Sequence, residues 1–153
     1  TYLRALDFCR PGDVLLIDAG GDLANAVVGG ILTLYAAKAG LAGVVIDGAI
    51  RDVAEIRSRE FPVYARGVTH RGPYKDGPGE INVPISIGGM VVNPGDVVVG
   101  DEDGLLAIPP AQVADLIVKA RGVLESEART IRAIEEGRWD RSFVNDLEAR
   151  CKN

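Results

Sequence analysis

Apolar and polar positions change their spacing along this chain, and each change marks a new element. Short runs rich in β-branched residues, bounded by glycine and proline, predict strands over residues 14–18, 44–47, 62–65, 81–87, 97–99 and 105–108. The segment 43–50 is apolar at nearly every position, which is typical of a strand buried on both faces. Gly88 and Gly89 lie between two β-rich runs and predict a hairpin turn.

Helical spacing predicts three further segments: one between residues 22 and 39, a short one after Arg51, and a long one over 110–136. The order is therefore α/β at first, β-rich in the middle and helical at the end. A chain of 153 residues predicts one domain. Pro-Gly-Asp-Val occurs twice, at 11–14 and 94–97, and we interpret both copies as turns.

Composition excludes several classes of partner. A net charge of -5 with 17 Lys+Arg gives no basic footprint for nucleic acid, and no segment approaches the ~20 apolar residues of a membrane span. Cys9 and Cys151 form no CxxC pair, which favours a reducing cytoplasm. We therefore expect a cytoplasmic protein whose partners are small molecules or further copies of itself. The start at Thr1 suggests a chain trimmed from, or beginning inside, a longer one.

The main candidate site is the pair Arg51 and Asp52, which directly follows the buried run. Ligands of α/β sheets bind at the carboxyl ends of strands. Asp52 could supply oxygen to Mg²⁺, Arg51 could bind a substrate carboxylate with its planar guanidinium, and Glu55 could hold a metal-bound water. The structural alternative is that Asp52 caps the following helix and Glu55 completes a capping box.

Three other positions also leave two interpretations open. Gly29 and Gly30 open an Ala-rich stretch, where free helix amides would bind an anion or where small residues would allow close packing. Glu127 falls inside the apolar stripe of the long helix and needs a partner there, unless it reaches solvent at the edge. His70 lies in a Gly- and Pro-rich loop, and we interpret it as a surface residue, although a general base is chemically open.

These residues together resemble the RraA-like family, in particular its class II pyruvate aldolases acting on 4-hydroxy-4-methyl-2-oxoglutarate and 4-carboxy-4-hydroxy-2-oxoadipate. Gly30, then twenty residues, then Arg51-Asp52-x-x-Glu55 matches the spacing of these aldolases. Further segments that look like family segments cover most of the chain: 11–14, 43–52, 79–84, 94–96 and 101–104.

The resemblance implies a swivelling β/β/α fold of the phosphohistidine-domain type with a long C-terminal helix. It implies one domain over residues 1–153 that lacks the family's N-terminal helix and strand. It also implies homotrimers or homohexamers with active sites between subunits.

The same resemblance implies roles for individual residues. The aspartate matching Asp52 binds Mg²⁺ or Mn²⁺ in the related aldolases, with Glu55 behind it. A glutamate donated by a neighbouring subunit is best matched by Glu127. The substrate carboxylate is held by backbone amides and one arginine, which match Gly29, Gly30, Ile31, Leu32 and Arg51.

The implied activity is that of a lyase releasing pyruvate from 4-hydroxy-2-oxo acids, with oxaloacetate decarboxylation as a second reaction. Both pass through pyruvate enolate. The metal would chelate the 2-oxo acid and Arg51 would add positive charge near the enolate oxygen, while a metal-bound water, or Glu127 acting through one, moved protons. The alternative is a non-enzymatic family member that inhibits an RNA-degrading endonuclease, of which the enterobacterial type has no acid at the position matching Asp52. A methyltransferase is disfavoured because no glycine-rich nucleotide motif is present.

Overall fold

The computed structural model describes residues 2–74 and 77–144, and the chain divides into two compact units, 1–107 and 108–153. The first unit is built around β3 (Gly43–Ile50), whose eight residues are all buried. Its β-branched side chains have few rotamers to lose and fit a pleated, covered surface. The apolar run therefore forms the doubly buried strand that its sequence predicts.

Four parallel strands form the sheet of the first unit. β1 (Val14–Asp18) pairs with residues 43–47 of β3, and β2 (Ala26–Val28) pairs with its last two residues. These two strands thus follow one another along one edge of β3, and β4 (Val63–Val68) pairs along the other edge. Between β1 and β2, the Gly21 amide donates to the Asp47 carbonyl at 2.9 Å, so the edge stays bonded across the gap.

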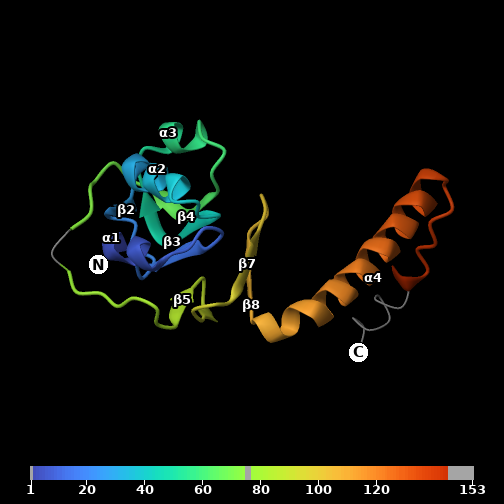
Figure 1. The fold of residues 1–153 in the computed structure, drawn as a ribbon. Coiled ribbons are helices and arrows are strands. Elements are labelled where there is room, and N and C mark those ends of the chain that lie inside the picture. The colour runs from blue at the N-terminus through green and yellow to red at the C-terminus, as the bar shows by residue number, and fades with distance from the viewer. Residues whose placement is uncertain (1, 75–76, 145–153) are drawn as a thin grey trace, which may run out of the picture. The chain divides into compact units, whose positions relative to one another are not determined.

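The helices of this unit are short. They are α1 (Tyr2–Ala5), the 3-10 turn η1 (Leu6–Phe8), α2 (Gly30–Lys38) and α3 (Val53–Arg57), shown in Figure 1. Alternate side chains of β3 join the buried residues of η1, α2 and α3 in one core. The buried members of this core are Leu6, Leu15, Val28, Leu32, Ala36, Leu41, Val44, Ile46, Ile50 and Ile56.

Two hairpins follow the sheet. β5 (Ile85–Ile87) and β6 (Met90–Val92) pair antiparallel, and β7 (Val97–Gly100) pairs with β8 (Leu105–Ile108). Gly88 and Gly89 connect β5 to β6 with φ values of 59° and 83°. Positive φ at both central residues suits the twist of a tight hairpin, which confirms the predicted turn.

The second unit contains α4 (Pro110–Glu135), which begins at a proline as helices often do. None of the 26 residues of α4 is buried. The expected α/β fold with a long C-terminal helix is confirmed, whereas one domain over the whole chain stays a prediction. No helix in the described part of the chain combines the length and apolar character needed to cross a membrane.

Sequence patterns located most elements but did not predict α1, η1 or β2, and they made one strand too long. The predicted strand over 81–87 is only three residues long, because Asn82 has a positive φ of 57° and Pro84 lacks an amide hydrogen. β2 lies inside the range 22–39, where the sequence predicts only a helix. Both Pro-Gly-Asp-Val copies are turns, as expected, since Gly12 and Gly95 each have φ 91°.

Candidate active site

The site begins where β3 ends. The Arg51 amide donates to the Val28 carbonyl at 3.0 Å, and the next residue, Asp52, turns into the left-handed region with φ 61° and ψ 35°. Aspartate tolerates this conformation better than most side chains do. The Asp52 carboxylate accepts a hydrogen bond from the Gly30 amide at 2.9 Å, and its Oδ2 lies 3.6 Å from Arg51 Nε. This hydrogen bond joins the end of β3 to the start of α2.

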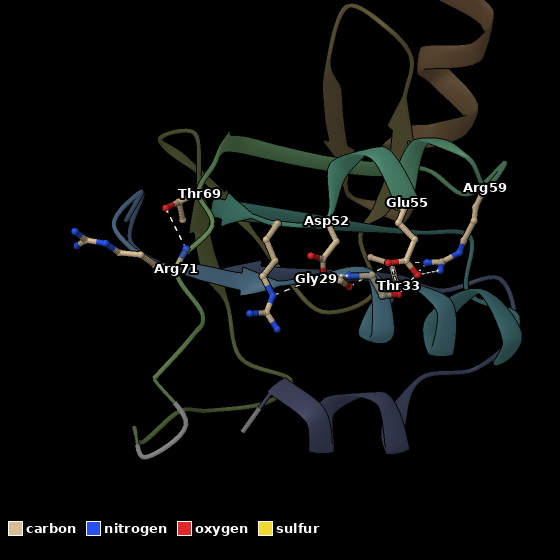
Figure 2. A network of polar contacts seen from close by, with 9 residues as sticks. Gly29, Thr33, Asp52, Glu55, Arg59, Thr69 and Arg71 are labelled. Atoms are coloured by element: carbon tan, nitrogen blue, oxygen red, sulfur yellow. Dashed lines mark hydrogen bonds and ion pairs between the residues drawn. The ribbon is translucent and has the colours of Figure 1, made fainter.

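The capping interpretation of Asp52 and Glu55 is wrong. Asp52 occupies the position before α3, but its side chain makes no capping hydrogen bond. The carboxylate bonds to the N-terminus of α2 instead, where amides lack intrahelical acceptors and the helix dipole favours negative charge. Glu55 forms an ion pair with Arg59. Figure 2 shows both carboxylates close to the start of α2.

Gly29 and Gly30 give these carboxylates room. A Cβ on Gly29 would lie 2.6 Å from Asp52 Oδ2, and a Cβ on Gly30 would lie 2.4 Å from Glu55 Oε2. Both distances are shorter than van der Waals contact allows. The two glycines therefore allow the acidic side chains of Asp52 and Glu55 to approach the N-terminus of α2 closely.

A second set of contacts fixes the first turn of α2. Arg59 Nη1 donates to the Gly30 carbonyl at 2.9 Å and to Thr33 Oγ1 at 3.4 Å, and the Thr33 hydroxyl donates to the same carbonyl at 3.0 Å. Thr33 is buried, so its hydroxyl needs this acceptor. Sequence reasoning missed Arg59 and Thr33, although Glu55 and Arg59 stand four residues apart, the spacing of a helical ion pair.

Of the predicted substrate-binding residues, all except Gly30 line one cavity of about 370 Å³. Arg51 and Asp52 line it, and each side chain is 42% exposed, so a ligand can reach both. Gly29 lines it just before α2, and Ile31 and Leu32 line it from the first turn of that helix. The remaining lining is mostly apolar: Leu3, Leu6, Asp7, Val27, Val28, Tyr35 and Pro73. This mixture of apolar walls and a few convergent polar groups is typical of a small-molecule site.

The donor set fits a divalent ion that keeps most of its water. The described residues contain no cluster of three His, Cys, Asp or Glu side chains suited to a metal. Mg²⁺ is commonly held by one or two carboxylates plus water and substrate oxygens. Asp52 can supply one such carboxylate, since only its Oδ2 takes part in the contacts seen within the described chain.

The other sequence candidates are not among the residues that line this cavity. Glu127 is an exposed residue of α4 in the second unit. His70 is exposed in its loop, as predicted. The Cys9 thiol is half-buried and donates to the Ala5 carbonyl at 3.4 Å, and burial, with a smaller contribution from Asp13, raises its pKa. Cys151 lies outside the described residues.

Comparison with known proteins decides the family. The family profile RraA-like, described as Aldolase/RraA, matches residues 1–107. The chain belongs to the RraA-like family. The resemblance carried by Arg51, Asp52 and Glu55 is thereby confirmed at the level of the family.

Two curated relatives of this RraA-like protein have names that state an activity. A protein of Halalkalibacterium halodurans named "Putative 4-hydroxy-4-methyl-2-oxoglutarate aldolase" is 42% identical over 136 residues, which is 89% of this chain and 65% of that protein. The 4-hydroxy-4-methyl-2-oxoglutarate aldolase of Thermus thermophilus is 43% identical over 98 residues, 64% of this chain and 60% of the relative. The chain thus spans under two thirds of the length of these relatives.

A solved structure supports the same fold. Streptomyces coelicolor RraAS2, described as an unusual member of the RNase ES inhibitor RraA protein family, matches with a TM-score of 0.78 at 32% identity. The match covers 85% of this chain and 67% of that one.

Proposed function

We propose that this RraA-like protein is a divalent-metal-dependent lyase that cleaves 4-hydroxy-2-oxo acids, of the 4-hydroxy-4-methyl-2-oxoglutarate type, to pyruvate. The observation that carries the proposal is the convergence of Arg51, Asp52 and the first turn of α2 on one cavity. The names of the aldolase relatives support the reaction class. Oxaloacetate, which leaves the same pyruvate enolate on decarboxylation, is proposed as a second substrate.

The first step is binding of the substrate's carboxylate. The amides of Ile31 and Leu32 belong to the first turn of α2, where helices bind anions. Arg51 lines the same cavity and can form two parallel hydrogen bonds to a carboxylate. Together these groups would orient the 2-oxo acid with its reacting end toward Asp52.

The reaction then requires control of charge and protons. Mg²⁺ or Mn²⁺ held by Asp52, with Glu55 behind it, would supply Lewis acidity at the 2-oxo group. The C4 hydroxyl loses its proton, and C4 becomes the carbonyl carbon of the second product as the C3–C4 bond breaks. The electron pair of that bond forms the pyruvate enolate, which takes up a proton at C3. Arg51 would stabilise the developing oxyanion. Glu127 of a neighbouring subunit would carry protons through a water.

A coupled assay tests the proposal. Pyruvate release from 4-hydroxy-4-methyl-2-oxoglutarate, and separately from oxaloacetate, would be followed with lactate dehydrogenase in Mg²⁺ and in EDTA. We expect metal-dependent release that is lost in Asp52→Asn, while circular dichroism shows the fold retained. Full activity of Asp52→Asn, or equal rates with EDTA, would refute the metal-dependent mechanism.

The likeness to RraAS2 supports a second candidate function, a non-enzymatic regulator that binds an RNA-degrading endonuclease. The acid at Asp52 favours the enzyme, because a binding protein has no need of a reactive carboxylate beside an arginine in a cavity. A folded, metal-loaded protein that releases no pyruvate but inhibits an RNase E-type endonuclease would favour the regulator over the lyase.

A further inference from the structure

A cation lies at the positive end of α2. The N-terminus of a helix favours anions, so an arginine there is opposed by the helix dipole. Arg59 nevertheless donates to the carbonyl of Gly30, the first residue of α2, at 2.9 Å. Its side chain is only 22% exposed, unlike that of a solvated surface arginine. The contact is therefore held in place by its surroundings.

Glu55 explains how this arrangement is tolerated. Its carboxylate pairs with Nη2 of Arg59 while Nη1 of the same guanidinium reaches the Gly30 carbonyl. The two charges offset one another, which leaves the helix N-terminus attractive to the Asp52 carboxylate. A planar guanidinium can bond two acceptors in fixed directions, whereas a lysine ammonium is a single point charge on a flexible stem.

Gly30 is consequently held from two sides. Its amide donates to Asp52 and its carbonyl accepts from Arg59, so α2 is tied at one residue both to the end of β3 and to the segment after α3. We propose that Arg59 is a positioning residue of this site, which holds the first turn of α2 so that the Gly30 amide stays on the Asp52 carboxylate. The expected loss of activity rests on the proposed function, whereas the role of Arg59 in holding the Gly30 amide does not.

The test compares three variants. Arg59→Met keeps an apolar side chain of similar length and removes the guanidinium. Arg59→Lys keeps the positive charge but not the planar guanidinium that bonds two acceptors. Arg57→Met is the matched control, an exposed arginine of α3. We expect Arg59→Met to lower kcat/KM for pyruvate release by about 10- to 100-fold. Arg59→Lys should recover part of the loss, and Arg57→Met should match the wild type.

A second readout needs no activity. In ¹⁵N-resolved spectra the Gly30 amide resonance reports the hydrogen bond from this amide to Asp52. The spectrum of Asp52→Asn gives the reference position of the Gly30 resonance when residue 52 has no carboxylate. We expect Arg59→Met to move the Gly30 resonance toward that position, while Arg57→Met leaves it unmoved. If the wild type releases no pyruvate, the proposed function fails and this resonance still decides the role of Arg59.

Three results would overturn the inference. The first is a Gly30 resonance that stays in place in Arg59→Met. The second is unchanged turnover in an active enzyme despite a moved resonance. The third is an equal effect of Arg57→Met, which would show that loss of any positive charge near α3 suffices.

Discussion

At the residue scale, the missing side chains of Gly29 and Gly30 matter as much as the charged ones. Asp52 and Glu55 approach the start of α2 more closely than a Cβ would allow. The atoms that a Cβ would meet belong to side chains, namely those of Arg51, Asp52 and Glu55. Those side chains can move without unfolding the chain, so substitution should damage the site more than the fold.

Gly29→Ala tests this argument. Since the new methyl would displace the Asp52 carboxylate, we expect kcat/KM to fall by about 10- to 100-fold, the usual effect of misplacing a reacting group. The thermal midpoint should change little, because Gly29 has an extended backbone that alanine also adopts. Gly77→Ala is the control, since a Cβ added there would meet no atom within 4 Å. Wild-type kinetics in Gly29→Ala would contradict the argument.

At the element scale, two aspartates attach the β5–β6 hairpin to the parallel sheet. The Gly88 amide donates to Asp47 at 3.3 Å, and the Ser86 amide donates to Asp18 at 3.3 Å. Asp47 is buried within β3 and pairs with Arg66 of β4. The hydrogen bond from Arg66, helped by the Gly88 amide, holds the pKa of Asp47 below its ordinary value, although burial acts in the opposite direction.

This pair should make stability depend on pH. An unfolded aspartate has a pKa of about 3.9. Because folding lowers the pKa of Asp47, its ionised form stabilises the fold above that value, and this contribution is lost as the pH falls through the folded pKa. We expect Asp47→Asn to lower the urea midpoint at pH 7, and the difference from wild type to shrink below pH ~4. Asp103→Asn, at an exposed loop position, should show neither effect.

Another element-scale prediction concerns α4. Gly122 lies inside this exposed helix, and a Cβ added to it would meet no atom within 4 Å. Gly122→Ala should therefore raise helix stability by up to about 1 kcal/mol, since glycine is a poor helix former. Circular dichroism at 222 nm during heating would measure the gain, and a lower helix content would contradict it.

At the scale of the whole molecule, the proposed lyase places Asp52 and Glu127 of one site on different subunits. Asp52→Asn and Glu127→Gln should each be nearly inactive alone. Subunits that mix at random in a closed ring would restore about one quarter of the sites, those with Asp52 from one parent and Glu127 from the other. Activity that stays absent after unfolding and refolding the mixture together would contradict shared sites.

Local patterns sufficed for much of this molecule and failed where distant segments meet. The strands Val14–Asp18 and Leu105–Ile108 form where alternation and turn residues predict them, and Arg51 with Asp52 lies at the expected sheet end. Spacing alone suggested that Asp52 caps its own helix. The Asp52 carboxylate instead accepts from the amide of Gly30 at the start of α2, 22 positions earlier in the chain. Local propensity does not encode such a tertiary contact.

The left-handed backbone at residue 52 restricts how this site can diverge. Only glycine, asparagine and aspartate adopt that conformation at low cost, so most replacements would strain the chain besides removing the acid. Relatives could lose the acid at low structural cost through asparagine or glycine, each one nucleotide change away from an aspartate codon. Under the proposed function, an Asn or Gly at this position in a relative would indicate loss of the lyase activity on an intact scaffold, which makes residue 52 a simple criterion for sorting such sequences.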